Sequence, residues 1–296
     1  MGIPESKLQT WSNPGATTTA TLTYDSVKAA LVAPTSPVRE RDFEVYLQGS
    51  YRNATNIRGD SDVDIVVQLN SAFRSNYSDV PQEDRPPPYA NFSAASYGWS
   101  DFRNDVVNAL RAYYDTNLIV DGNKSVKVTG ASGRLNADLV VCVQYRNYKS
   151  LQSSQDPFAE GITFWATRES RWIVNYPKLH YQKGVDKNSE TDGLYKQTIR
   201  LFKNARTHLV DSRTIDQFLA PSYFVECLLY NVPADRFAAD NQTDFCNVVN
   251  WLAGASLSSF LCQNEQVLLF GNMSEQWTET KARALQDALV NLWNHW

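Results

Sequence analysis

The first 150 residues of the chain contain short runs in which apolar residues either alternate with polar ones or stand together. Such runs are typical of β-strands, especially where β-branched and aromatic residues dominate. They predict strands in four segments, namely residues 43–47, 61–69, 125–129 and 137–145. Apolar residues recur every three or four positions in residues 24–31 and 100–114, which predicts two helices. The pattern favours an α/β (α+β) arrangement for this half of the chain.

From about residue 188 onward the helical period dominates. It predicts further helices over residues 194–210, 222–230, 242–262 and 275–296. We therefore expect an α/β core over residues 1–170 and a helical lobe over residues 171–296. Ligand sites form preferentially between domains, so the cleft between the two parts is the expected site.

Charge and cysteine usage narrow the class of protein. The 28 basic and 32 acidic residues leave a net charge of −4, which disfavours a non-specific nucleic-acid binder. The four cysteines have neither the spacing of a metal clip nor that of a disulfide framework. Neither a signal peptide nor a membrane span is expected from the sequence. These features predict a soluble cytoplasmic protein with reduced thiols and no membrane partner.

The strongest chemical signal is a pair of aspartates in the strand predicted at 61–69. Asp62 and Asp64 are two residues apart, so both carboxylates point to the same face of a sheet. Adjacent carboxylates repel each other unless cations lie between them, and a pair of Mg²⁺ ions is the usual solution in phosphoryl transfer. A third aspartate, Asp138, begins a later predicted strand with apolar neighbours. Two aspartates at this spacing are common, and Asp138 could simply cap its strand, so the acids alone leave a structural role open.

A glycine and a serine next to the preceding strand strengthen the catalytic interpretation. Gly49 and Ser50 follow residues 43–47 and stand twelve positions before Asp62. A glycine lets backbone N–H groups approach a triphosphate closely, and the serine hydroxyl adds a donor. A strand, a Gly-Ser turn, a strand with two acids and a later strand with a third acid together favour a nucleotide-binding catalytic site.

This constellation resembles the nucleotidyltransferase superfamily that includes DNA polymerase β. Further motifs narrow the resemblance to the bacterial cGAS/DncV-like nucleotidyltransferases (CD-NTases) and, within them, to the CdnE clade. The segments that carry it span roughly residues 20–235 and include 49–56, 60–64, 175–177, His180, 184–188, 195–196 and 200–203. The resemblance implies a polymerase-β-like catalytic core over residues 1–170, built on a mixed sheet, and a helical nucleotide-binding lobe over residues 171–296.

The same resemblance implies that Asp62, Asp64 and Asp138 hold two Mg²⁺ ions, for which Mn²⁺ can substitute. Gln48, Gly49 and Ser50 are expected to contact the nucleotide. The implied activity is condensation of ribonucleoside triphosphates, such as ATP or UTP, into a cyclic di- or trinucleotide. The implied role is antiphage (CBASS) signalling through a separate effector protein. The zinc ribbon through which cGAS binds DNA has no counterpart in the cysteine and histidine spacing, so activation by DNA is not implied.

In the predicted helix over 194–210, Lys196, Arg200 and Lys203 form one basic stripe. Such a stripe is usually a solvated face, but it could also hold triphosphate oxygens, and the resemblance favours the second role for Lys203. The resemblance to cGAS also assigns Ser222 to phosphate binding and Tyr223 to base stacking. An ordinary helix cap and a core tyrosine are the alternatives for these two residues.

Two residues of the segment after 170 are also candidates. The Asn175 side chain offers a donor and an acceptor, which can pair with the edge of a uracil, so we expect it to read the base. His180 matches a position of the family pattern, but no chemistry is assigned to it.

Two other functions stay open at this point. One is a nucleotidyltransferase that modifies an RNA or protein acceptor, which a basic groove would favour and the net charge of −4 disfavours. The other is a catalytically silent nucleotide sensor, for which three clustered acids would serve no purpose.

Overall fold

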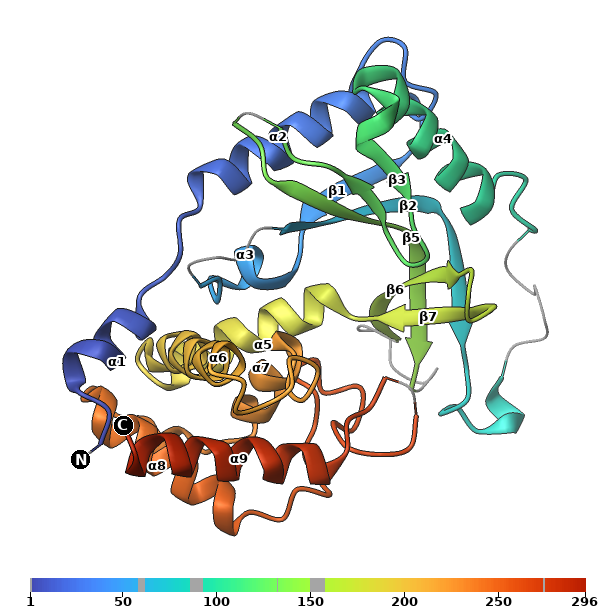
Figure 1. Cartoon of the computed structure of the whole chain (residues 1–296). Helices are drawn as coiled ribbons and strands as arrows, with labels where there is room; N and C mark the ends of the chain where they lie inside the picture. The colour runs from blue at the N-terminus through green and yellow to red at the C-terminus, as the bar shows by residue number, and fades with distance from the viewer. Residues whose placement is uncertain (1, 58–61, 86–92, 132, 150–157, 274) are drawn as a thin grey trace. The chain divides into compact units, whose positions relative to one another are not determined.

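The computed structural model describes residues 2–57, 62–85, 93–131, 133–149, 158–273 and 275–296 (Figure 1). Its helices are α1 (Glu5–Ser12), α2 (Thr18–Val32), α3 (Gly49–Asn53), α4 (Trp99–Tyr113), α5 (Pro177–Glu190), α6 (Leu194–Asp211), α7 (Ser222–Tyr230), α8 (Asn241–Gly254) and α9 (Glu279–Asn294). Its strands are β1 (Phe43–Leu47), β2 (Asp62–Asn76), β3 (Ile119–Asp121), β4 (Val126–Val128), β5 (Asn136–Tyr148), β6 (Phe158–Ala166) and β7 (Arg171–Asn175). Short 3₁₀ helices occur at Gln82–Asp84, Thr116–Leu118 and Ala234–Arg236.

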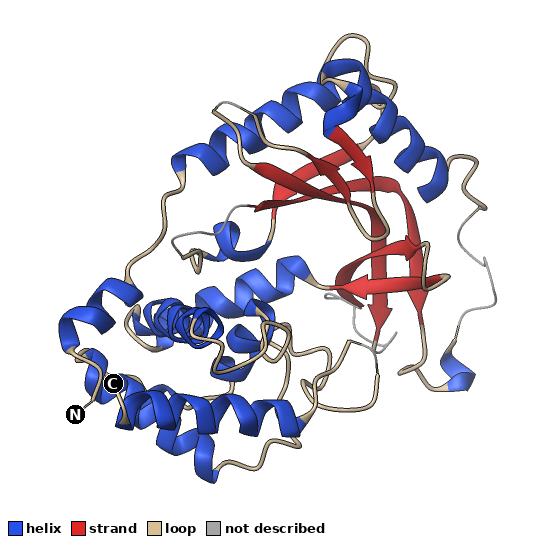
Figure 2. Cartoon of the chain, viewed as in Figure 1, coloured by secondary structure: helices blue, strands red, loops and turns tan. Residues whose placement is uncertain are grey.

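The strands form one mixed sheet in the order β1-β2-β5-β4-β3, and β6 pairs with both β5 and β7. Only the β2–β5 pair is parallel among the described pairings; the other pairs are antiparallel. Helices α2 and α4 cover one face of this sheet (Figure 2). The predicted mixed sheet is therefore confirmed.

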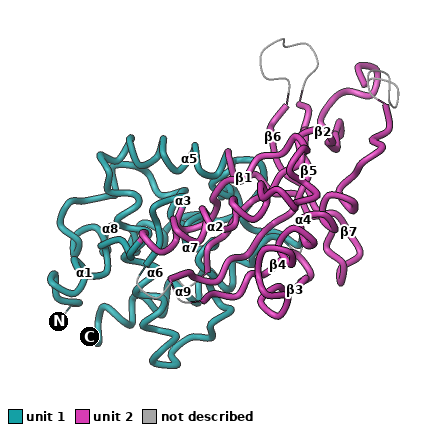
Figure 3. The backbone as a smooth tube through the Cα atoms, turned by 90° about the horizontal axis from the view of Figure 1, so that it is seen from above, with its two compact units in different colours: residues 1–16, 52–60, 179–296 teal, residues 17–51, 61–178 magenta. Residues whose placement is uncertain are grey.

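Contacts divide the chain into two compact units (Figure 3). The sheet unit comprises residues 17–51 and 61–178, and the helical unit comprises residues 1–16, 52–60 and 179–296. The division differs from the expected one at residue 170, because the chain enters the helical unit three times. Residues 52–57, which begin in the last turn of α3, pack in the helical unit, whereas Gly49–Tyr51 before them and β2 after them belong to the sheet unit.

Each unit has its own apolar core. The sheet unit buries alternate residues of β2 and β5, such as Ile65 and Leu139, against α2 and α4. The helical unit buries one side of α6, α7, α8 and α9, including Phe202, Phe224 and Phe245. Within the described part of the chain, every helix is too short or too polar to cross a lipid bilayer.

Most predicted elements are confirmed, with shifted ends. The helix predicted over 242–262 is wrong beyond residue 254, because the chain turns extended at Ala255 and Ser256 hydrogen-bonds Ser258. The last helix begins at Glu279 rather than 275, where the Thr278 hydroxyl accepts the N–H of Lys281 and caps the first turn. Helices α1 and α5 and strands β3, β6 and β7 were not predicted.

Candidate active site

Asp62 and Asp64 lie on one face of β2, as their spacing predicts. Val63 and Ile65, the residues between and after them, are fully buried on the opposite face. In the parallel register, Asp64 lies opposite Asp138 and Asp62 lies opposite Asn136. All three carboxylates therefore lie on the same face of two neighbouring strands, away from α2 and α4, with Asp64 and Asp138 at the same level and Asp62 two residues before them.

Gly49 lies directly against this acidic group. Its φ of +66° is in the left-handed region that disfavours other residues, and a Cβ there would lie 2.2 Å from Oδ2 of Asp64. The preceding residue, Gln48, donates its backbone N–H to the Asp64 carbonyl at 2.9 Å. Ser50 is the second residue of α3 and is half-buried. The predicted turn is therefore the first turn of a short helix, and only a glycine fits at its start.

Asp62 and Asp138 have partners within the sheet unit. Asn136 donates to Asp62 at 3.0 Å, and Asp138 accepts from Ser125 at 3.2 Å and pairs with Lys127 at 3.4 Å. Nowhere in the described residues do three His, Cys, Asp or Glu side chains converge closely enough to hold an ion. The donor set nevertheless fits Mg²⁺, which prefers carboxylate oxygens. The ion pair between Lys127 and Asp138 is a small obstacle to metal binding, because exposed ion pairs of this kind stabilise a protein by only about 0–1 kcal/mol.

Asn175 ends β7 and its side chain is exposed. Its Oδ1 accepts the N–H of Tyr176 at 3.3 Å. The residues after it are anchored by Lys178, whose ammonium lies 2.5 Å from Glu44 and 2.8 Å from Glu160. Burial by itself lowers the pKa of Lys178, but the hydrogen bonds that its ammonium donates to the two glutamates outweigh this effect and raise the pKa. Lys178 was not predicted, although a lysine three residues after Asn175 was visible in the sequence.

The basic stripe of α6 faces inward. Lys203 is 2% exposed and donates to the Thr55 carbonyl at 2.9 Å and to Glu226 at 3.3 Å. Arg200 is also buried and donates to the carbonyls of Ser12 and Ala54, each at 2.6 Å. The solvated-face alternative is therefore wrong for both residues, because their charged groups bind backbone carbonyls and, for Lys203, a buried carboxylate.

Lys196, the third cation of the stripe, is half-buried. Its ammonium lies 5.7 Å from the ring centroid of Tyr181. Burial and the neighbouring charge of Arg200 lower its pKa. Contact of Lys196 or Lys203 with a nucleotide stays a prediction.

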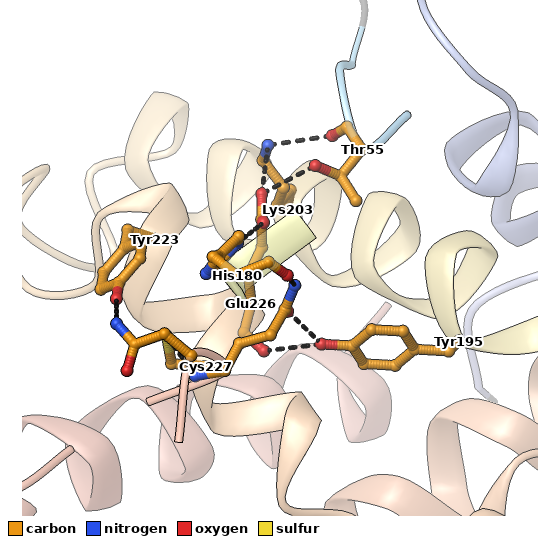
Figure 4. Close-up of polar contacts among 9 residues, drawn as sticks. Thr55, His180, Tyr195, Lys203, Tyr223, Glu226 and Cys227 are labelled. Atoms are coloured by element: carbon orange, nitrogen blue, oxygen red, sulfur yellow. Dashed lines mark hydrogen bonds and ion pairs between the residues drawn. The ribbon is translucent and has the colours of Figure 1, made fainter. Parts of the chain in front are cut away.

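Glu226 is the centre of a buried polar cluster that the sequence analysis missed (Figure 4). Its carboxylate accepts from Thr55 Oγ1 at 2.8 Å, pairs with Lys203, and lies 3.3 Å from Nε2 of His180. Burial by itself would raise the pKa of Glu226, but the hydrogen bond with His180 and the charge of Lys203 outweigh it and hold the pKa at about 2. Glu226 is therefore ionised, and His180 has a structural partner.

Ser222 and Tyr223 open α7, with Pro221 in the capping position before them. Ser222 is exposed. Tyr223 is 38% exposed and stacks on the His180 ring at a centroid distance of 5.3 Å. Tyr223 is thus not an enclosed core residue, while the burial of its hydroxyl raises its pKa.

The helical unit matches a family model. Residues 182–294 fit the model of the cGAS/DncV-like nucleotidyltransferase C-terminal helical domain. Together with the sheet and its three acids, this match defines the class as cGAS/DncV-like nucleotidyltransferases.

Comparison with individual proteins narrows the class. The cyclic UMP-AMP synthase of Rhodothermus marinus is 50% identical over 296 residues, covering 100% of this chain and 99% of the relative. The cyclic nucleotide synthase CdnE01 of Staphylococcus haemolyticus is 41% identical over 302 residues, covering 100% of both. The structure of the Rhodothermus marinus CdnE c-UMP-AMP synthase with Apcpp and Upnpp superposes with a TM-score of 0.90, covering 99% of this chain and 97% of that one. The chain belongs to the CdnE cyclic nucleotide synthases of the cGAS/DncV-like nucleotidyltransferase family, as the sequence motifs predicted.

Proposed function

We propose that the protein joins two ribonucleoside triphosphates, one of them UTP, into a cyclic dinucleotide. The observation that carries the proposal is the parallel register that sets Asp64 opposite Asp138, with Gly49 in contact with Asp64. Membership of the CdnE family supports the same reaction. A uridine-containing product is supported by the 50% identical relative, which is named a cyclic UMP-AMP synthase.

Asp62, Asp64 and Asp138 would hold two divalent ions, Mg²⁺ or Mn²⁺, which when bound neutralise phosphate charge and lower the pKa of the attacking hydroxyl. Each bond would form by in-line attack of a ribose hydroxyl on an α-phosphorus, with pyrophosphate leaving. One of the three carboxylates can accept the proton of that hydroxyl.

Gly49 and Ser50 would contact the donor triphosphate, because the glycine removes the side chain that keeps a backbone away and the serine offers a hydroxyl. Gln48 precedes them, and we assign it to the same contact. The exposed amide of Asn175 would pair with the uracil edge through its donor and its acceptor.

On the helical unit, Ser222 would bind phosphate and Tyr223 would stack on the donor base. Lys196 would add a positive charge to the same nucleotide. The signalling role, in antiphage defence through a separate effector protein, rests on the family resemblance alone.

The test is incubation with each NTP alone and with all four together, with Mg²⁺ or Mn²⁺, followed by phosphatase treatment and mass spectrometry. We expect a phosphatase-resistant cyclic dinucleotide containing uridine. Asp62→Ala/Asp64→Ala should abolish it, whereas Glu40→Ala, which removes an acid with an 89% exposed side chain, should not. No cyclic product under any condition, or a product that survives in the aspartate variant, would contradict the proposal.

A further inference from the structure

Residues 52–57 are the described part of the linker that separates the two parts of the candidate site, Gly49–Ser50 and Asp62, in the sequence. Thr55 comes five positions after Ser50 and seven before Asp62. The segments before and after this linker belong to the sheet unit, but the linker itself packs within the helical unit. Its residues Asn53, Thr55 and Asn56 are buried, with 5%, 1% and 1% of their surfaces exposed. The linker is therefore buried at these three polar side chains, whereas Arg52 and Ala54 are exposed.

Two cations of α6 bind the linker through its backbone. Arg200 donates to the carbonyl of Ala54, and Lys203 donates to the carbonyl of Thr55. Ala54 has a φ of +56°, in the left-handed region that costs a non-glycine residue about 1–2 kcal/mol. Such a conformation persists only where surrounding contacts impose it. The two cations therefore hold the linker in a shape that it would not adopt alone.

Glu226 completes the anchor. Its carboxylate accepts a hydrogen bond from the hydroxyl of Thr55 and forms an ion pair with the ammonium of Lys203. One carboxylate therefore binds both the linker and the lysine that holds the linker. Within the cluster formed by Thr55, His180, Lys203 and Glu226, Thr55 is the only member that comes from the linker (Figure 4). The carboxylate is 4% exposed, so water competes little for these bonds.

We propose that Glu226 and Lys203 are positioning residues, which act through Thr55 to fix the linker and thereby the donor turn at Gly49–Ser50, with which the linker shares helix α3. The proposal rests on the proposed function, because it assigns the purpose of the anchor to nucleotide binding. It also differs from a direct contact between Lys203 and the triphosphate, since here the lysine works through the backbone of Thr55.

The helical unit offers a matched control for the key hydrogen bond. Thr198 in α6 donates its hydroxyl to the buried carboxylate of Asp244 at 2.8 Å, as Thr55 does to Glu226. Thr198 is 2% exposed and lies outside the linker. Thr55→Val and Thr198→Val therefore delete the same kind of bond at the same depth, and only the first touches the linker.

The experiment measures kcat and KM for each triphosphate, and separately the Kd of a nonhydrolysable ATP analogue with Mg²⁺, for the wild type and both valine variants. Misplacement of the linker by a fraction of an ångström is expected to lower kcat/KM and weaken the analogue about tenfold in Thr55→Val. Thr198→Val should leave both quantities within about twofold of the wild type while losing a similar amount of thermal stability. Equal effects of the two variants would overturn the proposal.

A second comparison separates positioning from direct contact. If Lys203 works through the linker, Glu226→Gln and Lys203→Met should weaken the analogue to a similar degree. If Lys203 instead binds the triphosphate, removing the charge of Glu226 would leave the affinity equal or higher while Lys203→Met lowers it, and that result would overturn the proposal. The binding arm needs no turnover, so a wild type that binds the analogue but makes no cyclic product would refute the proposed function alone.

Discussion

Replacing Gly49 with alanine should disable catalysis far more than it destabilises the fold. The added Cβ would lie 2.2 Å from Oδ2 of Asp64, well inside any normal contact distance. The φ of +66° at this residue also disfavours alanine. The substitution therefore has two effects: the cost of placing a non-glycine residue at positive φ, and a displacement of the Asp64 carboxylate.

The two parts can be given magnitudes. Placing alanine in the left-handed region costs about 1–2 kcal/mol of folding free energy. To reach a normal contact, the Asp64 carboxylate or the turn must move by about 1 Å. A misplacement of that size in a catalytic group costs about 100-fold in kcat/KM, or about 2.7 kcal/mol of transition-state stabilisation.

Gly133 supplies the control. It lies in the same unit with a φ of +80°, and a Cβ added there meets no heavy atom of the described residues within 4 Å. Urea unfolding should show similar losses of stability in Gly49→Ala and Gly133→Ala, and the kinetics of cyclic-product formation should be measured on the same two variants. Only Gly49→Ala should lose activity, by about 100-fold. Equal activities in the two variants would refute the argument that Gly49 protects the position of Asp64.

Three further outcomes are expected. Asn175→Ser should shift the nucleotide preference away from UTP, which competition between UTP and ATP followed by mass spectrometry would detect; an unchanged product ratio would remove Asn175 from base recognition. The pKa of Glu226, about 2 against an ordinary 4.5, should contribute of the order of 3 kcal/mol of stability above about pH 4.5, lost as the pH falls toward 2. Urea unfolding of Glu226→Gln should therefore lack this acid-labile part, and parallel pH profiles of the two proteins would contradict it. Burial raises the pKa of Asp244 to about 6 from 3.8, so ionisation destabilises the fold as the pH rises from about 4 to 6. Asp244→Asn should lose that pH dependence, and a variant whose stability still falls over this range would count against it.

The strands that carry the acids were predictable because their patterns are local. Alternation in β2 puts Asp62 and Asp64 on one face whatever the partner strand is. The pairing itself was not predictable in this way, because register depends on contacts between residues far apart in the sequence. Asp64 meets Asp138 through such a pairing, across more than seventy residues.

Elements without a clean period were missed. Strand β7 has only three apolar residues, in a row between Arg171 and Asn175, and α5 mixes charged and apolar residues with no clear apolar stripe. The opposite error occurred after Gly254, where the uncharged residues that follow the helix continue through an extended Ala255 into a turn closed by the hydrogen bond from Phe260 N–H to the Leu257 carbonyl. The helix propensities of these residues favour neither a helix nor a non-helical chain strongly, so tertiary contacts decide where the helix ends.

The burial of Arg200 and Lys203 in the basic stripe could have been predicted from another part of the sequence. Helix α7 holds a single charged residue, Glu226, among nine positions. An ionised acid inside an apolar helix is costly unless a cation or several donors meet it, so this helix demands a partner such as Lys203. Asp244 shows the alternative: its hydrogen bonds come from the neutral donors Thr198 and Ala238, and its pKa rises to about 6 instead of falling. A lone acid in a buried helix thus indicates that a polar partner is buried beside it, and the direction of the pKa shift of the acid indicates whether that partner is a cation.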